Sequence, residues 1–356
     1  MNILFVADNK KGTGFYRMMM PANEIRKANL AGVRLVFAAE QADVEWADIV
    51  VVQMPYHQSM FELFDWAKSI GKVMVYEIDD YLQGIDPSNP SYRIWNSTGP
   101  HLQRAMALLE KADAVTVSTD RLQREYAPWN SKIYVIPNFL EKTLFPDKLP
   151  VKKSKTITIG YTGAASHQKD LELVDDVITK FCQNHPEVTL KLFGIEPEKA
   201  FKKIPRYDGK WNGTKIKHQL EVIKGCDITN YFHKLSMQEF DIGIAPLVDN
   251  SFNSCKSDLK IKEYGSLGIP VVASDVYPYR KIVQNGKNGF LAGSADEWYK
   301  SLEILVKDVK KRKEMGKNNL QMVDKEAWIH DNVAIWVNTY QTIYNNMLRA
   351  AGVMPQ

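Results

Sequence analysis

Short apolar runs alternate with amphipathic stretches along the first part of the chain. The runs are rich in Val and Ile and show little alternation with polar residues, which is typical of strands buried on both faces of a parallel sheet. The stretches between them place apolar residues at helical spacing, and Gly32 and Gly71 stand where helices are expected to stop. The predicted strands are residues 2–8, 33–39, 47–54, 72–79, 113–119 and 132–138, and the predicted helices are 19–30, 59–70 and 101–112.

The alternating pattern pauses at residues 145–155, FPDKLPVKKSK, and then restarts. Two prolines and a cluster of lysines in this stretch are typical of a linker. Residues 205–223 are expected to form a glycine-rich turn and then a helix, and further helical segments lead to the C-terminus. The strands expected after the linker are residues 156–163, 188–195, 240–247 and 269–275.

Repeated strand–helix units predict an α/β protein with two Rossmann-like domains, each built on a doubly wound parallel sheet. The first domain is expected over residues 1–147 and the second over 156–327, facing each other across a central cleft. Trp328 and Trp336 lie in a helical pattern after the last strand, so residues 328–356 are expected to pack back on the first domain. Ligands of open parallel sheets bind at the carboxyl ends of the strands, where functional residues are therefore expected.

Composition places the chain among globular proteins that can bury a core. It has 356 residues, of which 45% are hydrophobic and 25% charged, and a formal net charge of +4. This charge is too small to indicate a nucleic-acid-binding protein by itself. The three cysteines are widely spaced, which argues against a disulfide framework or a zinc site. No basic segment precedes the first apolar run and no run is long enough to cross a bilayer, so we expect a cytoplasmic protein.

The stretch SDLKIKEYGSLG predicts a helix that follows the strand at 240–247. Ser257 is the expected N-cap, with Asp258 in the first turn. The start of such a helix offers unpaired N–H groups and a positive dipole end to an anion, and Lys256 and Lys260 add charge there. Glu263 is placed to accept hydrogen bonds from the hydroxyl pair of a sugar. A surface helix with solvated charges is the alternative for this stretch.

The runs KEYGSLGIPVVASDV and KIYVIPNFLEKTLFPD resemble the group 1 (family 4) retaining glycosyltransferases. That resemblance implies the GT-B fold and a nucleotide-diphosphate sugar as co-substrate, with no tightly bound cofactor. In the family, two glutamates are separated by seven residues, and the second binds the ribose hydroxyls of the donor. Glu263 matches this second glutamate. Cys255 stands at the position of the first, which usually holds the donor sugar, so Asp258 or another group would replace it.

Two further stretches extend the resemblance to the donor-binding loops of the family. NKKGTGFYR follows the first strand as a glycine-rich loop, in which Gly12 and Gly14 would let the backbone approach a diphosphate. Arg17 would then contact phosphate bidentately. In IGYTGAASHQK, at the start of the second domain, the counterparts of the family's phosphate-binding residues are Gly163 and Lys169, with His167 as a hydrogen-bonding residue of the loop; Tyr161 replaces the family's arginine.

Asp79 and Asp80 end the predicted strand at 72–79, on the edge where ligands are expected. The family often has His-Asp there, whereas a subset of uncharacterised and phage proteins has Asp-Asp. The pair is predicted to orient or deprotonate an acceptor hydroxyl, and is therefore assigned the catalytic role. A divalent cation is possible between two carboxylates but is not expected from the family, and a simple turn is the remaining alternative.

The sequence therefore predicts a hexosyl- or pentosyltransferase that moves a sugar to an acceptor hydroxyl with retention of configuration. The acceptor is left open between a glycan, a lipid and a modified DNA base, the last because of lysine clusters and scattered tryptophans. An epimerase of nucleotide sugars and a catalytically inactive nucleotide-sugar or glycan-binding protein are the alternatives. The donor sugar, the nucleobase and the oligomeric state do not follow from the sequence.

Overall fold

The computed structural model describes residues 1–146, 152, 156–163, 167–194, 216 and 218–353. The contacts within the chain divide it into two compact units. The first unit comprises residues 1–141, 255–257 and 328–356, and the second comprises 142–254 and 258–327. The expected boundary at 147–156 therefore lies a few residues after the observed division, and the last segment of the first unit begins at Trp328.

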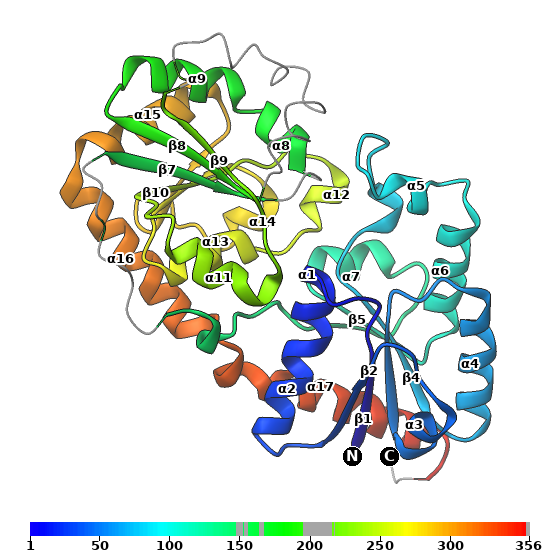
Figure 1. Cartoon of the computed structure of the whole chain (residues 1–356). Coiled ribbons are helices and arrows are strands. Elements are labelled where there is room, and N and C mark those ends of the chain that lie inside the picture. Colours follow the sequence, from blue (N-terminus) through cyan, green and yellow to red (C-terminus); the bar gives the residue numbers. More distant parts are fainter. Residues whose placement is uncertain (147–151, 153–155, 164–166, 195–215, 217, 354–356) are drawn as a thin grey trace. The chain divides into compact units, whose positions relative to one another are not determined.

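The first unit contains a parallel six-stranded sheet with the order β2-β1-β3-β4-β5-β6 (Figure 1). Five of its strands lie within runs predicted from the apolar pattern, and β2 begins one residue before the predicted run at 33–39. Adjacent residues of β4 face opposite sides of the sheet, and the whole strand is buried, because helices cover both faces. The strands are β1 (Asn2–Val6), β2 (Gly32–Val36), β3 (Ile49–Gln53), β4 (Val73–Ile78), β5 (Ala114–Val117) and β6 (Ile133–Val135).

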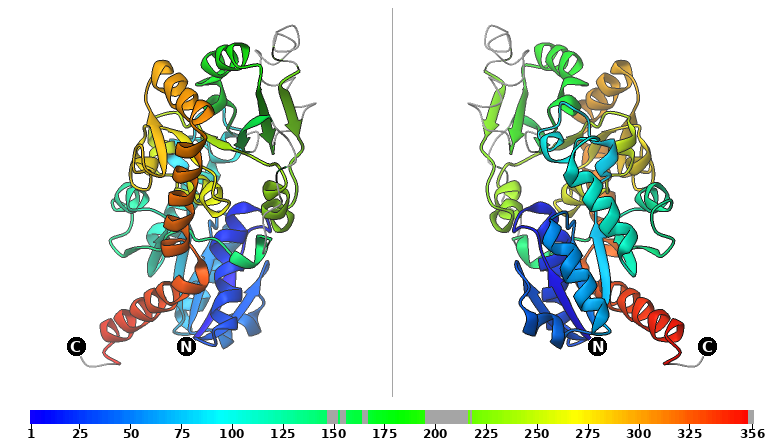
Figure 2. Two further views of the ribbon diagram at one scale, coloured as in Figure 1. Left: turned by 90° about the vertical axis from the view of Figure 1, so that its left-hand side faces the viewer. Right: turned by 90° about the vertical axis from the view of Figure 1, so that its right-hand side faces the viewer.

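The helices of the first unit form a layer on each face of this sheet. On one face α2 packs against the C-terminal helix α17, and on the other α4 packs against α6 (Figures 1 and 2). Trp336 of α17 is fully buried in a core that includes Phe5 and Ile25. The elements are α1 (Gly12–Gly14), a π-helix (Phe15–Met19), α2 (Met20–Lys27), α3 (Gln41–Trp46), α4 (Gln58–Ser69), a 3₁₀ turn (Leu82–Gly84), α5 (Tyr92–Trp95), α6 (Pro100–Lys111), α7 (Asp120–Tyr126) and α17 (Ile329–Ala350).

The two glycines that were expected to stop helices differ in their roles. Gly71 follows α4 with a φ of 77°, the left-handed conformation that glycine favours at a helix end. Gly32 is instead the first residue of β2, so the predicted role of Gly32 is wrong. The helix before it ends at Lys27, and Asn29 takes the left-handed conformation with a φ of 53°. Asparagine adopts this conformation more readily than other residues with a side chain, which makes it a second common residue at this position.

The second unit also has a parallel six-stranded sheet, with the order β12-β11-β10-β7-β8-β9. The predicted helix at the end of 205–223 is wrong, because residues 220–223 form the edge strand β9. LEVI is too short for its apolar spacing to distinguish a strand from a helix, and its pairing with β8 decides the outcome. The strands are β7 (Ile157–Thr162), β8 (Val188–Phe193), β9 (Leu220–Ile223), β10 (Ile242–Ala245), β11 (Val271–Ser274) and β12 (Gly289–Ala292).

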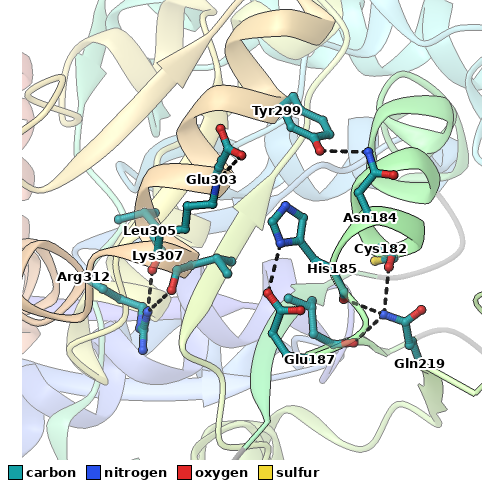
Figure 3. Close-up of polar contacts among 12 residues, drawn as sticks. Cys182, Asn184, His185, Glu187, Gln219, Tyr299, Glu303, Leu305, Lys307 and Arg312 are labelled. Carbon is teal, nitrogen blue, oxygen red and sulfur yellow. Dashed lines mark hydrogen bonds and ion pairs between the residues drawn. The ribbon is translucent and has the colours of Figure 1, made fainter.

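One face of the second sheet buries apolar residues of α9 and α15, and the other buries residues of α11 and α13. A hydrogen bond of 3.0 Å from Asn184 Nδ2 to the Tyr299 hydroxyl joins α9 and α15 near the amino ends of the strands (Figure 3). Beside it, Gln219 Nε2, just before β9, donates to the carbonyl oxygens of Cys182 and His185 at 3.0 and 2.9 Å. The helices are a 3₁₀ turn (Lys142–Leu144), α8 (Gln168–Glu172), α9 (Asp175–Asn184), α11 (Ile228–Ser236), α12 (Ser251–Ser254), α13 (Leu259–Ser266), α14 (Tyr277–Arg280), α15 (Ala295–Lys307) and α16 (Val309–Glu326).

Candidate functional site

The strand order of the second unit reverses between β7 and β10. The chain segments that follow these two neighbouring strands go to opposite faces of the sheet, which opens a crevice at the carboxyl ends of the strands. Ligands of doubly wound sheets bind in this crevice. Asp170 joins the two segments that follow these strands. Its Oδ1 accepts hydrogen bonds from Val248 N at 2.8 Å and Asn253 Nδ2 at 3.2 Å, and its Oδ2 lies 2.8 Å from Nδ1 of His167. Asp170 is 4% exposed, so this carboxylate is a structural anchor of the crevice.

Helix α13 places two of the predicted donor-binding residues at this switch point. Nζ of Lys260 donates to the carbonyl oxygen of Thr162, the last residue of β7, and lies 4.7 Å from the centre of the Tyr161 ring. Glu263 is 9% exposed, and its Oε2 accepts a hydrogen bond of 2.8 Å from the hydroxyl of Tyr231. A cation and a carboxylate therefore lie one turn apart along the helix that follows the switch point.

Tyr231 of α11 holds the Glu263 carboxylate in place. Its ring stacks on Phe193, with 5.6 Å between the ring centres and 12° between the planes. Burial, and then the charge of Glu263, raise the pKa of Tyr231 well above the ordinary value. The hydroxyl is therefore protonated at neutral pH and donates to the carboxylate. The sequence prediction did not include Tyr231, because nothing in the spacing of residues links it to Glu263.

The start of α13 differs from the prediction. Asp258, not Ser257, occupies the N-cap position, and its carboxylate lies 2.7 Å from Nζ of Lys262. The Ser257 side chain instead accepts a hydrogen bond of 3.1 Å from Asn138 Nδ2, within the first unit. Gly268 follows the helix with a φ of 66°, the left-handed conformation that glycine favours at a helix end. Because the Asp258 carboxylate is paired with Lys262, Asp258 is a poor substitute for the family's first glutamate.

The loop after β7 contains the other donor-binding residues predicted for the second unit. The amide of Gly163 donates to Phe193 O at 3.0 Å, and a Cβ atom at this glycine would lie 2.4 Å from the Tyr161 hydroxyl oxygen. Glycine is therefore required here by packing against Tyr161. His167 is bonded to Asp170 as described, whereas Lys169 is exposed on α8.

A hollow of about 500 Å³ lies at the carboxyl ends of β8 and β9, beside the start of α11. It is lined by Gly194, Gly225, Cys226, Asp227, Asn230 and Lys234. None of these residues was predicted from the sequence. Gly194 has a φ of 98°, a conformation that a residue with a side chain rarely adopts, so the lining depends on a glycine there.

In the first unit, Arg17 takes a role different from the one predicted. It is fully buried, and its Nε and Nη2 donate to the two carboxylate oxygens of Glu77 at 2.7 and 3.2 Å. Its Nη1 donates to Ile136 O at 2.6 Å and to Asn138 Oδ1 at 2.9 Å. The guanidinium also lies 4.7 Å from the ring centre of Trp336. Because these partners occupy the fork, the predicted bidentate contact of Arg17 with phosphate is wrong for this structure.

The glycine-rich loop after β1 is likewise used for packing. A Cβ atom at Gly14 would lie 1.8 Å from the carbonyl oxygen of Asn9, so only glycine fits where the loop turns back on itself. Gly12 has open space around its Cα and begins the short helix α1. Gly14 thus shapes the turn that leads Arg17 into the core, while the predicted approach of this loop to a diphosphate stays a prediction.

Asp79 and Asp80 follow β4 directly, as predicted. Oδ1 of Asp79 is enclosed and has no hydrogen-bond partner among the residues that the structure describes. Burial, and then the charge of Asp80, raise the pKa of Asp79 to about 7, although Arg17 and Lys256 act in the opposite direction. A carboxyl group with this pKa exchanges protons near neutral pH, which suits a general acid or base.

The tripeptide Cys255–Ser257 belongs to the first unit by its contacts. Thr119 Oγ1 donates to the carbonyl oxygen of Cys255 at 2.9 Å, and the charge of Lys256 acts on Asp79. The Cys255 side chain is 1% exposed. A buried thiol cannot contact a sugar, so Cys255 does not take over the role of the family's glutamate.

Among the residues that the structure describes, no group of three or more His, Cys, Asp and Glu side chains is arranged to hold a metal ion. None of the helices in the described part of the chain combines the length and the apolar composition needed to span a membrane.

The second unit is similar in sequence to a known family. Residues 156–308 match the family model described as "Glycosyl transferases group 1". The matched residues are 153 of the 356 in the chain, which is less than half. A relative from Bacillus subtilis, TuaH, is named as a teichuronic acid biosynthesis glycosyltransferase and is 22% identical over 189 residues. That match covers 48% of this chain and 42% of TuaH, so the chain spans less than half of this relative's length.

Solved structures extend the similarity over nearly the whole chain. HepE from Anabaena, solved in complex with UDP-glucose, has a TM-score of 0.66 at 16% identity, with 99% of this chain and 100% of that chain covered. Sucrose-phosphate synthase from Thermosynechococcus elongatus has a TM-score of 0.67 at 13% identity, with 97% and 99% covered. These similarities confirm the predicted GT-B fold with its two parallel-sheet domains.

Proposed function

We propose that the chain is a nucleotide-sugar-dependent glycosyltransferase. It moves a hexosyl or pentosyl group from a nucleotide-diphosphate sugar to an acceptor hydroxyl, with retention of configuration as in family 4. The observation that carries this proposal is the pair formed by Lys260 and the Tyr231-bonded Glu263 on α13, at the switch point of the second unit. A cation suits a diphosphate and a held carboxylate suits a ribose diol, so the pair fits a nucleoside diphosphate.

The proposed donor site would lower the barrier by stabilising the leaving group. When the bond between the sugar and the diphosphate breaks, negative charge develops on the diphosphate. Lys260 and the first amides of α13 are in place before the reaction and stabilise this charge without reorganising. The hollow beside Gly194 and Lys234 would receive the nucleobase. Gly163, His167 and Lys169 complete the proposed donor site within the second unit. The predicted donor contacts of Lys256 and Ser257, which belong to the first unit, stay predictions.

Asp79 and Asp80 are proposed to act on the acceptor. With its pKa near neutrality, Asp79 can accept the proton of an acceptor hydroxyl as the hydroxyl attacks the sugar. Attack from the side on which the diphosphate leaves would retain the configuration. The proposed mechanism uses no metal ion. A divalent cation bound by the two carboxylates is the alternative, and a chelator tests it.

One observation favours a second candidate function, a catalytically inactive nucleotide-sugar-binding protein. The family's first glutamate is replaced by Cys255, which is buried, and Asp258 is paired with Lys262. A chain that lacks this group would bind the nucleotide without transferring the sugar. The epimerase alternative has no observation of its own in its favour.

Turnover distinguishes these functions. The chain is incubated with a panel of nucleotide sugars and with glycan, polyprenyl-phosphate and hydroxymethylated-DNA acceptors, and release of nucleoside diphosphate is measured. Release that depends on an acceptor is the expected result. Saturable nucleotide binding without release would support the inactive binder, and interconversion of donors without an acceptor would support the epimerase. Addition of a chelator tests the divalent cation.

We expect Glu263→Ala to weaken binding of the nucleoside diphosphate by about 1.5–3 kcal/mol, the value of a hydrogen bond to a charged group. This corresponds to roughly a ten- to hundredfold rise in Kd. Calorimetric titration is the measurement. Glu303→Ala, a change of the same residue type on α15 near the amino ends of the strands, is the matched control and should leave Kd unchanged. Equal Kd values for the folded Glu263→Ala protein and the wild type would remove Glu263 from the site.

Tyr231→Phe is expected to raise the same Kd a few-fold, because it removes the hydrogen bond that orients Glu263 while keeping the ring stacked on Phe193. In a Glu263→Ala background the same change should have no further effect, since the bond is already gone. A double-mutant cycle of Kd values tests this. Additive effects of the two changes would show that Tyr231 does not act through Glu263.

A further inference from the structure

Aromatic side chains from separate segments of the first unit gather after β3. The Tyr56 ring meets Trp95 of α5 with 4.9 Å between ring centres and 75° between planes, and His101 of α6 at 5.0 Å and 79°. His57 lies against the same ring at 4.3 Å. We call Tyr56, His57, Trp95 and His101 the aromatic cluster. Tyr56, Trp95 and His101 are partly exposed and His57 is exposed, so the cluster is a surface feature and not part of the core.

The segments that begin with Tyr56 and with the carboxylate pair follow adjacent strands of the sheet. Gln53 of β3 pairs with Glu77 of β4, and the next amide, Met54 N, donates to Glu77 O at 2.9 Å. Tyr56 and the carboxylate pair therefore both follow the carboxyl ends of two adjacent strands, within a few residues of the last paired positions. The strand order of the first unit also reverses between β1 and β3, so the cluster follows a strand of the switch point, where a doubly wound sheet binds its ligand.

The backbone at this edge is held in an unusual conformation. Met54 has a φ of 39°, in the left-handed region that a residue with a long side chain rarely adopts. Such a conformation costs on the order of 1 kcal/mol and is concentrated at functional sites. Met54 turns the chain out of β3 and so sets the position of Tyr56 two residues later.

Polar atoms without partners lie at the ends of neighbouring strands and in the aromatic cluster itself. Within the described part of the chain, no hydrogen bond reaches Gln53 Nε2, Asp79 Oδ1, Ser118 Oγ or His101 Nδ1, all of which are enclosed. Gln53 and Ser118 are 3% and 4% exposed. Each enclosed polar atom without a hydrogen-bond partner costs about 1–3 kcal/mol of free energy. A bound ligand that both donates and accepts hydrogen bonds would recover part of this cost. Hydroxyl groups have this property, and the atoms named include an N–H donor, a carboxylate acceptor and a hydroxyl.

We propose that the aromatic cluster is the acceptor subsite and that the acceptor is a saccharide, whose ring packs on Tyr56 and Trp95. This inference rests on the proposed function. The C–H groups of a sugar ring carry partial positive charge and are attracted by the negative face of an aromatic ring. The hydroxyl groups of the same sugar supply the hydrogen bonds that the strand ends lack.

The charges at this edge favour a neutral saccharide over nucleic acid. Asp79 and Asp80 follow β4, and a DNA acceptor would bring phosphates close to them. The exposed lysines of the edge, Lys10 and Lys11, follow β1, on the other side of β3 from the carboxylates. A lipid chain is also disfavoured, because it would leave the enclosed polar atoms without partners.

The test uses the full chain and its binding to three classes of probe. Ligand-observed NMR with a panel of neutral and acidic oligosaccharides measures contact and Kd, and single-stranded hydroxymethylated DNA and polyprenyl phosphate in detergent are measured alongside. Tyr56→Leu and Trp95→Leu keep an apolar side chain but remove the ring. Trp129→Leu is the matched control, since Trp129 is 40% exposed in the same unit and follows α7, away from the strands' carboxyl ends.

We expect the wild type to bind at least one saccharide, and each cluster variant to raise its Kd roughly tenfold or more, the loss typical of removing an aromatic anchor. Trp129→Leu should not change it, and binding of uridine diphosphate should be equal in all variants. Saccharide binding that is unchanged in both cluster variants would overturn the proposal, as would a wild type that binds only DNA or lipid, or no saccharide. Uridine diphosphate binding by the same samples separates these outcomes from failure of the proposed function, in which the nucleotide does not bind.

Discussion

Replacement of Arg17 by methionine is expected to lower the free energy of unfolding of the first unit by about 3–5 kcal/mol, the cost of leaving one charge of a buried pair without its partner. Arg17 and Glu77 are both 0% exposed. Methionine fills much of the space but cannot bond the carboxylate. Among the described residues, Thr116 Oγ1 then remains as the donor to Glu77, at 2.5 Å. The carbonyl oxygen of Ile136 and Oδ1 of Asn138 lose their donor as well.

Urea denaturation measures this effect, and two further variants make it specific. Arg124→Met removes an exposed ion pair of the same unit, in which Arg124 Nη2 lies 3.4 Å from Asp120, and should change the free energy of unfolding only slightly. The double variant Arg17→Met, Glu77→Met removes both buried charges and should recover part of the loss. A loss no larger for Arg17→Met than for Arg124→Met would show that the buried pair does not stabilise the unit.

Asp79→Asn is expected to lower turnover by about 10²- to 10⁴-fold, the usual contribution of a general base. Binding of the nucleoside diphosphate should change little, because the interaction is used mainly in the transition state. Asparagine keeps the size of the side chain and removes the proton acceptor. Steady-state kinetics and calorimetry on the same protein give the two numbers, and Asp80→Asn shows which carboxylate acts.

The pH dependence of Asp79 follows from its raised pKa of about 7. A general base acts when deprotonated, so wild-type turnover should rise as pH increases through about 7, and this rise should be absent from Asp79→Asn. The free energy of unfolding is expected to fall over the same rise in pH. The folded state holds the proton of Asp79 more tightly than the unfolded state, so ionisation destabilises the wild type progressively from the ordinary pKa of the carboxyl group up to about 7.

Asp79→Asn should therefore unfold at a higher temperature than the wild type at pH 8, with a smaller difference at pH 5. Thermal unfolding at the two pH values provides this measurement. Full turnover of both the Asp79→Asn and the Asp80→Asn proteins would exclude the base and leave the pair as a turn. Loss of activity with a chelator, restored by Mg²⁺, would instead indicate a metal held by the two carboxylates.

The apolar pattern alone was enough to predict the two parallel sheets. Strands buried on both faces have continuous apolar runs, and their short length and their content of Val and Ile distinguish most of them from buried helices. The pattern failed at both edges of the second sheet. Residues 220–223 were predicted as a helix but pair with β8, and β12 (Gly289–Ala292), which pairs with β11, was not predicted. The position of Asp79 and Asp80 was also predictable, since it depends only on where β4 ends.

The partners of the charged residues were decided by the tertiary structure. A glycine-rich loop and an arginine are typical of phosphate binding, yet the π-helix after Gly14 turns Arg17 inward to Glu77, sixty positions away in the sequence. The clue in the sequence was Glu77 itself, because a carboxylate inside an apolar strand requires a buried cation. Tyr231 and Glu263, and likewise Tyr56 and Trp95, are brought together only by folding. The sequence determined the strands and the edge at which each unit carries its functional residues, because these depend on local periodicity. Which side chains meet at that edge depends on the packing of distant segments, and only the tertiary structure could decide it.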